Sequence, residues 1–185
     1  MNSPDIIEAF WPKDLFEKGI GWVIIARIKA GGRKAVAEIF LVDVWCLGVK
    51  RTIHEVCDPE DYRQRIRNHY LSEFPMEQIP PARARSLVEQ AVQYAMALGL
   101  PPAAGYEKAS RVFAQIPPLA EHFTFGRDGK PFYVSGPNET EAGARRILEH
   151  LMRRSGPANF DYLVEAPANP KLVPGGRIEL PTKGL

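Results

Sequence analysis

The clearest pattern of hydrophobic and polar positions lies in residues 19–48, where two runs rich in β-branched side chains flank Gly31-Gly32. A glycine pair tolerates the positive φ angles of a tight turn, so the pattern predicts a β-hairpin. Its second strand is apolar on both faces, which predicts a strand inside the sheet, and residues 52–56 are expected to extend the hairpin into an antiparallel meander. Arg27 is then a diagonal neighbour of Glu38, which predicts a cross-strand ion pair. The register opposes Ile28 to Ala35, Ala26 to Ala37, Ile24 to Ile39 and Trp22 to Leu41.

Helical spacing of apolar residues dominates the middle and the end of the chain. The strongest helix repeats alanine, leucine and valine at helical intervals over residues 82–98 and stops at Gly99. Asp58 is expected to cap an earlier helix, and Asn138 with Glu141 forms a capping-box pattern before the last one. Helices are predicted at residues 13–18, 59–71, 82–98, 106–114 and 139–154.

A second hairpin is predicted in the stretch FTFGRDGKPFYVSG, residues 123–136. Asp128-Gly129 is a strong two-residue turn signal, and it would place Phe125 opposite Phe132. Residues 160–166 could add a closing strand. The whole pattern predicts a single α+β domain over residues 1–168, built from an antiparallel β-meander, packed helices and this second β-hairpin.

Composition narrows the class of protein. The 185 residues are 45% hydrophobic and 25% charged, with a net charge of +2, which is ordinary for a globular domain and argues against a strongly basic nucleic-acid binder. No apolar run is long enough to span a bilayer, and the first residues do not resemble a signal peptide, so a soluble cytoplasmic protein is expected. The four histidines are scattered, and no metal site or cofactor is predicted.

Asp43 is the main candidate for chemistry because it interrupts the apolar stretch FLVDVWCLGVKR, residues 40–51. Strand alternation places it with Trp22 and Leu41, where an unpaired carboxylate is costly. Asp43 is therefore either a hydrogen-bonded structural residue, which is favoured, or a catalytic carboxylate at a cleft. Alternation puts Cys46 on the opposite face, which separates the thiol from the acid and assigns it to the core. Glu38 also lies on that face and is a poor partner for Asp43.

Five basic residues are candidates for binding. Lys50, Arg51 and His54 are the nearest basic side chains to Asp43 in sequence, and Arg63 and Arg67 lie on the helix at residues 59–71. With neighbouring tyrosines these arginines could contact nucleic acid. Ordinary solvated helix faces explain them equally well, as they do the arginines of the last helix.

Three stretches together carry a resemblance: FLVDVWCLGVKR, ALGLPPAAGYEKA and FGRDGKPFYVSGPNET. They resemble a family of bacterial proteins with the motifs FLVDxxCLGVK and FGxDGKPxY, for which no activity is established. The resemblance covers about residues 8–165 and implies one domain. Relatives usually have an acid where this chain has Arg51, so a carboxylate pair spanning positions 43 and 51 is missing here.

Residues 169–185 are expected to form a flexible tail. Within it, LVPGGRIELPTKGL resembles peptides produced when a reading frame runs through a neighbouring transfer-RNA gene. Under that interpretation the tail carries no selected function, and the gene lies beside a common landing site for mobile elements. An ordinary flexible terminus is the alternative.

Two functions follow from these observations. The favoured one is a non-enzymatic interaction or regulatory module, in a mobile-element or defence locus, because no catalytic constellation of several residues is visible. Its partner is expected to be a protein, with nucleic acid second and no membrane. The alternative is a metal-dependent, nuclease-like hydrolase in which Asp43 is a ligand of a divalent metal, a mechanism that needs several converging carboxylates.

Overall fold

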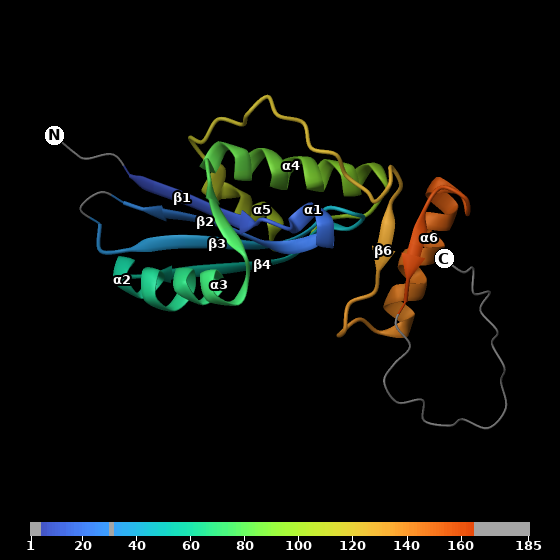
Figure 1. Cartoon of the computed structure of the whole chain (residues 1–185), viewed down its shortest axis with the longest axis horizontal. Coiled ribbons are helices and arrows are strands. Elements are labelled where there is room, and N and C mark those ends of the chain that lie inside the picture. The colour runs from blue at the N-terminus through green and yellow to red at the C-terminus, as the bar shows by residue number, and fades with distance from the viewer. Residues whose placement is uncertain (1–4, 30–31, 165–185) are drawn as a thin grey trace, which may run out of the picture.

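A five-stranded antiparallel sheet forms the centre of the protein in a computed structural model, which describes residues 5–29 and 32–164. The strand order is β4-β3-β2-β1-β5, so neighbours along the chain are mostly neighbours in the sheet (Figure 1). Together with the helices, this sheet makes the protein a member of the predicted α+β class. The strands are β1 (Ile6–Pro12), β2 (Ile20–Ile28), β3 (Ala35–Asp43), β4 (Gly48–Cys57) and β5 (Met76–Ile79).

Helices cover both faces of this sheet. Helix α4 packs over one face with α5 beneath it, and α2 and α3 lie against the other face (Figure 1). A π-helical turn, Tyr62–Arg67, joins α2 to α3. No helix of the described residues is long and apolar enough to cross a membrane. The helices are α1 (Leu15–Lys18), α2 (Pro59–Asp61), α3 (Asn68–Glu73), α4 (Pro81–Ala97), α5 (Tyr106–Ala109), which continues as a 3-10 turn to Phe113, and α6 (Glu141–Ser155).

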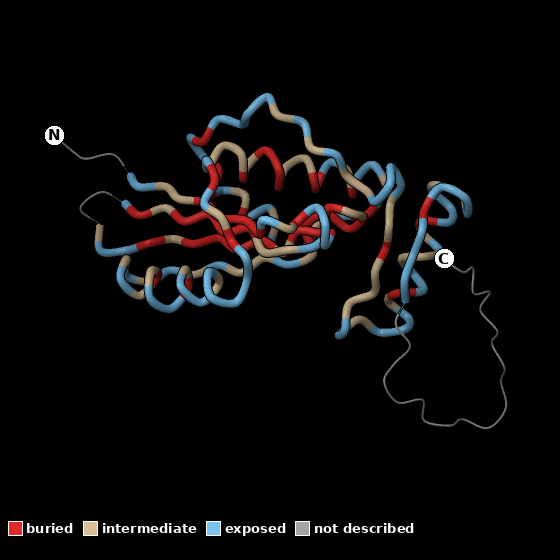
Figure 2. Tube along the Cα trace, viewed as in Figure 1, coloured by how far each residue is buried: buried red, intermediate tan, exposed pale blue. Residues whose placement is uncertain are grey.

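The predicted register of the first hairpin is confirmed. Strand β2 pairs with β3 from Ile28 opposite Ala35 to Trp22 opposite Leu41. Gly31 of the predicted turn lies outside the described residues. Strand β3 is inside the sheet and almost wholly buried, as Figure 2 shows in red. Alternate side chains of β2 and β3 belong to two hydrophobic cores on opposite faces of the sheet. One core contains Val23, Ile25, Phe40 and Val42 and packs against α4. The other contains Ile24, Ala26 and Ile39, which pack with Tyr62 and Ile66 of the π-helical turn.

Two strands of the sheet are absent from the sequence-based prediction. Strand β1 pairs with β2 on one side and with β5 on the other. Strand β5 lies in the proline-containing stretch FPMEQIPP, residues 74–81, between the helices predicted at residues 59–71 and 82–98. Both segments are short and carry a proline at or beside an end, so they lack the long β-branched run that identified the hairpin. Their side chains, such as Ala9 and Ile79, nevertheless complete the core under α4.

The second hairpin is only partly formed, which corrects its prediction. Asp128 and Gly129 have φ angles of 53° and 78° and make the expected tight turn, but the pairing stops at one bridge between Arg127 and Lys130. Strand β6 (Phe132–Val134) instead pairs in parallel with β7 (Asp161–Leu163), so Phe125 and Phe132 are not strand partners. The two arms separate because each donates a backbone hydrogen bond to the residues just after β3.

The last helix also begins differently from the prediction. Its cap is Thr140, whose side chain accepts a hydrogen bond from the Gly143 amide, rather than Asn138. Ala144 and Leu151 are buried, whereas Met152 is 50% exposed. Thr140 is the residue that leaves the helix with extended backbone (ψ 150°), the geometry that an N-cap requires.

A polar strap fastens the irregular segment before the second turn to α4. The Ser86 hydroxyl bonds both the amide and the carbonyl of Leu119, and the Gln90 side chain bonds the Glu121 carbonyl and the Phe123 amide. Arg83 completes the strap through a bidentate pair with Glu121. These side chains supply the hydrogen bonds that the extended segment lacks within itself.

Replacing Ser86 by alanine is expected to lower the free energy of unfolding by about 1–2 kcal/mol, because Ser86 is 2% exposed and the two groups of Leu119 that its hydroxyl bonds lose their partner. Hydrogen exchange at the Leu119 amide should accelerate in the same variant. Ser110→Ala is the control, since that hydroxyl makes one exposed bond to Glu107 and its loss should change stability by less than about 0.5 kcal/mol. Equal effects of the two substitutions would contradict the strap.

Candidate functional site

Asp43 ends β3 by folding its carboxylate onto the backbone of the next residues. Its Oδ1 accepts hydrogen bonds from the amides of Trp45, at 2.9 Å, and of Cys46, at 2.8 Å. The side chain is buried, with 5% exposure. Burial raises the pKa of Asp43 to about 6, and the Cys46 amide, the Lys50 charge and the Trp45 amide oppose that rise. This arrangement is a local turn stabilised by an aspartate, which favours the structural role over the catalytic one.

The position of Cys46 corrects the sequence-based separation of acid and thiol. Strand β3 ends at Asp43, so the side chains of the residues after it no longer alternate between the two faces of the sheet. The Cys46 amide consequently bonds Asp43, while the thiol is fully buried with Leu47 and Tyr133. Burial, with a further contribution from the Asp43 charge, raises the pKa of Cys46 to about 12. Cys46 is a core residue, as predicted, and its thiol is protonated and unreactive at neutral pH.

The turn that Asp43 stabilises binds the segment FGRDGKPF, residues 125–132. The Val44 carbonyl accepts from the Gly126 amide at 2.9 Å, and the Trp45 carbonyl accepts from the Phe132 amide at 3.1 Å. The Trp45 and Phe132 rings pack edge to face, and the Arg127 guanidinium lies over both. These contacts pull the two arms of the predicted hairpin apart. Asp43 therefore organises the contact between the sheet and the C-terminal part of the chain.

The next question is whether side chains near Asp43 could bind a metal ion. In the residues that the structure describes, no group of three or more His, Cys, Asp or Glu side chains is placed to hold a metal ion. Two-metal hydrolysis needs several carboxylates around a shared centre.

The five predicted binding residues do not form one site. Lys50 is close enough to Asp43 to affect its pKa, and Arg51 is an exposed residue of β4. His54 Nδ1 lies 2.5 Å from Glu38 Oε1. Arg63 and Arg67 are tied to acids on separate elements: Arg63 is 3.6 Å from Glu60, and Arg67 is 3.7 Å from Glu8.

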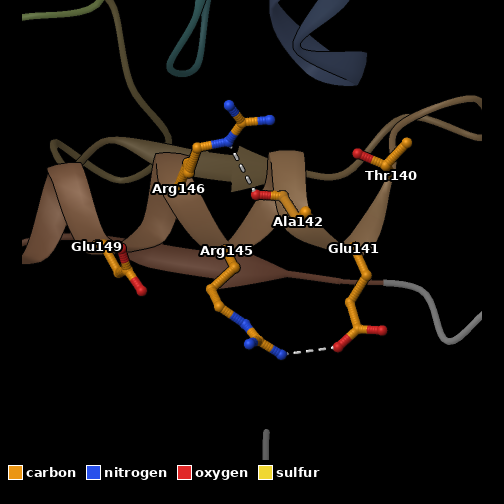
Figure 3. Close-up of a pocket in the computed structure, with 6 residues that line it drawn as sticks. All are labelled: Thr140, Glu141, Ala142, Arg145, Arg146 and Glu149. Carbon is orange, nitrogen blue, oxygen red and sulfur yellow. Dashed lines mark hydrogen bonds and ion pairs between the residues drawn. The ribbon is translucent and has the colours of Figure 1, made fainter.

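The arginines of α6 lie on an open helix surface (Figure 3). Arg145 pairs with Glu141 at 2.9 Å, and Arg146 Nε donates to the Ala142 carbonyl. Both partners belong to the same helix, as the dashed lines in Figure 3 show. This pattern is typical of a solvated helix face, where such pairs add a few tenths of a kcal/mol.

A row of large side chains crosses the sheet on the α3 side. The register places Trp22 opposite Leu41, and Leu41 opposite Arg51. Tyr70 packs edge to face on Trp22, with ring centroids 5.9 Å apart, and Phe74 stacks on Tyr70 at 6.0 Å. Trp22, Leu41 and Tyr70 are half-buried, while Arg51 and Phe74 are exposed. We call these five residues the aromatic–arginine surface.

A carboxylate–imidazole pair lies on the other face of the same strands. Glu38 and His54 are direct neighbours across β3 and β4, and they line a hollow of about 240 Å³. The predicted pair of Arg27 with Glu38 is not the one formed, because Arg27 bonds the carbonyls of Val112 and Ala114. The sequence pattern suggested Arg27 as the partner of Glu38 and made Glu38 a poor partner for Asp43. The register of β3 with β4 was the signal that could have paired it with His54.

The protein is an α+β protein with a row of partly exposed large side chains on one face of its sheet and a small hollow beside Glu38 and His54 on the other. A search of protein-family models, of curated proteins and of solved structures found no match to this chain.

Proposed function

We propose that this protein is a cytoplasmic, non-enzymatic interaction module that binds a partner protein through the aromatic–arginine surface. The single observation that carries the proposal is the partly exposed row of Trp22, Leu41 and Arg51, extended by Tyr70 and Phe74. Tryptophan, tyrosine and arginine are the residues most enriched among those that dominate binding energy in protein interfaces.

The shape of this surface suits an interface because its aromatic side chains are already held in place. Tyr70 is fixed between Trp22 and Phe74, and its pKa is raised by burial. Side chains ordered before binding lose little conformational entropy when a partner covers them. Phe74, at 37% exposure, still has apolar area to bury against a partner.

The charge of the surface indicates the chemistry of the partner. Arg51 forms no ion pair with any residue that the structure describes, although it lies near Tyr70. A guanidinium beside aromatic rings binds carboxylates in a bidentate geometry. The partner segment is therefore expected to combine an apolar side chain, which would contact Phe74, with an aspartate or glutamate that would contact Arg51.

The biological setting remains the one expected from the sequence: a bacterial regulatory module in a mobile-element or defence locus. Its support is the resemblance of residues 172–185 to transfer-RNA read-through, and those residues lie outside the described part of the chain. Sequencing the genomic DNA around the gene tests this setting directly, because a transfer-RNA gene overlapping the 3′ end is expected.

Affinity capture from the host, followed by binding of the purified partner, tests the interaction. The Arg51→Glu and Phe74→Ser variants are expected to weaken binding by about 30-fold each, the size typical of a residue central to an interface. Met96→Ser is the matched control, because Met96 is 58% exposed on α4, on the opposite face of the sheet, and should retain full binding.

Three outcomes would contradict the proposal. The first is capture that is equally strong with the wild type and the Phe74→Ser variant. The second is equal loss in the Met96→Ser control. The third is recovery of nucleic acid instead of protein, with gel-shift binding that depends on Arg51 and persists after protease treatment.

A further inference from the structure

Strand β4 is a long and regular edge of the five-stranded sheet. It pairs with β3 on one side and ends the strand order on the other. Residues 51–57 follow β3 in an unbroken register and contain no proline. Their backbone groups form no hydrogen bond outside the β3–β4 pair with any residue that the structure describes. Edge strands are usually short or interrupted by prolines and bulges, and an edge without these features can pair with another strand.

The segment before α5 limits the part of this edge that is open. The Val49 carbonyl accepts a hydrogen bond from the Ala103 amide at 2.8 Å, so another backbone already lies against β4 at that point. The strand ends at Cys57, immediately before the cap of α2. A further strand therefore has room to pair between Lys50 and Cys57.

The charges on this open edge match a second copy of the same strand. Arg51 and Glu55 are both close to Tyr70, which places them on one face of β4. Neither forms an ion pair within the described part of the chain. In an antiparallel pair of identical strands with a two-fold axis through Ile53, Arg51 of each copy lies opposite Glu55 of the other. The axis also sets the two Ile53 side chains against each other.

Other axes lose this match. An axis through His54 would put Arg51 opposite Cys57 and Glu55 opposite Ile53. An axis through Thr52 would put Arg51 opposite Ile53 and bring Glu55 to Val49, where the edge is already occupied. The axis through Ile53 also suits the backbone, because the residues it pairs are an even number of positions apart and so point their amides and carbonyls to the same side of the strand.

We propose that two copies of this protein pair through β4, antiparallel about Ile53, and form a dimer with one continuous sheet. Opposite charges directly across two strands stabilise the pair, and like charges destabilise it. The contact is small, so a dissociation constant on the order of 10–100 µM is expected.

The dimer goes beyond the proposed function and shares one residue with it. Glu55 of the second copy would contact the Arg51 guanidinium that we assign to the partner protein's carboxylate, so the two compete for Arg51. Glu55 is not part of the aromatic–arginine surface. The Glu55→Arg variant should therefore lose the dimer and still bind the partner protein, which keeps failure of one proposal distinct from failure of the other.

Sedimentation equilibrium of the full chain tests the dimer, at concentrations from about 1 µM to about 500 µM. Arg51→Glu and Glu55→Arg should each weaken the dimer about 30-fold, because two attractions become two repulsions. An equimolar mixture of these two variants should form a heterodimer of about wild-type affinity, since each like-charged strand then faces its opposite. No other arrangement of the two copies predicts this recovery.

Arg154→Glu is the matched control, because it reverses an exposed charge on α6 and should leave the dimer unchanged. Circular dichroism checks that each variant is folded. If a variant fails to fold, dilution of the wild type followed by NMR replaces it, and the amide shifts should be largest at residues 51–55.

A wild type that stays monomeric at about 500 µM would refute the dimer. A dimer that persists equally in Arg51→Glu would refute the β4 contact, as would dilution shifts that avoid β4. Two monomeric variants that remain monomeric when mixed would refute the register about Ile53.

Discussion

The Asp43→Ala variant is expected to be about 3 kcal/mol less stable than the Asp43→Asn variant. Asparagine keeps the oxygen that accepts from the Trp45 and Cys46 amides, whereas alanine leaves both amides without a partner, and the Cys46 amide is buried. Each orphaned amide costs about 1–3 kcal/mol. Equilibrium unfolding in urea measures the difference, and neither replacement titrates, so the result should not vary with pH.

The wild type is the control for pH dependence, because its Asp43 carboxylate titrates whereas alanine and asparagine do not. The pKa of Asp43 is raised from 3.8 to about 6 in the folded state, which therefore holds a proton that the unfolded chain has already released. The contribution of Asp43 to stability is complete below the lower value and is lost as pH rises through the upper one. Relative to the wild type, Asp43→Asn should gain up to about 3 kcal/mol across that window. Similar stability of the alanine and asparagine variants would contradict the structural role of Asp43.

The Gly48→Ala variant is expected to lose about 4 kcal/mol of stability. Gly48 has a φ of +63°, and a Cβ there would lie 2.7 Å from the Ala91 carbonyl oxygen and 2.8 Å from the Ala95 Cβ. The left-handed backbone costs about 1–2 kcal/mol for a residue other than glycine, and the contact with α4 adds about 1–3 kcal/mol because helix backbone cannot yield easily.

The Gly129→Ala variant separates the cost of the left-handed backbone from the cost of the steric contact with α4. Gly129 has a φ of +78°, but nothing lies within 4 Å of a Cβ built on it, so only the backbone cost of about 1 kcal/mol is expected. Thermal unfolding of both variants measures the difference. Similar losses at the two positions would show that α4 does not approach β4 as closely as the structure indicates.

Local chemistry made much of the fold predictable. The glycine turn set the β2–β3 register, and Asp58 caps its helix by accepting from the Glu60 and Asp61 amides. The prediction of the second hairpin was right about the turn and wrong about the two strands beside it. Asp128-Gly129 fixes the turn but not the path of the chain on either side of it. The Gly126 and Phe132 amides bond a turn more than 80 positions earlier in the chain. Contacts of that range leave no mark on a local pattern.

The candidate sites were harder to predict for the same reason. Arg51 and His54 became candidates because they are near Asp43 in sequence. In the structure they lie on opposite faces of β4, Arg51 near Tyr70 and His54 bonded to Glu38 of β3. Tyr70 reaches Trp22 because the π-helical turn before it changes the angle at which later residues leave the helix. Residues four apart drift around a regular helix, so the spacing of Tyr62, Ile66 and Tyr70 in the sequence could not place the Tyr70 ring.

The turn at residues 43–47 also bears on the order in which the protein assembles. The first four strands pair with their neighbours in sequence, so they can form while the rest of the chain is still being synthesised. At that stage the Val44 and Trp45 carbonyls lack their backbone partners, since the Gly126 and Phe132 amides do not yet exist. The nascent sheet therefore carries an open docking point, and a chain released before residue 126 would expose the Trp45 ring to chaperones and proteases.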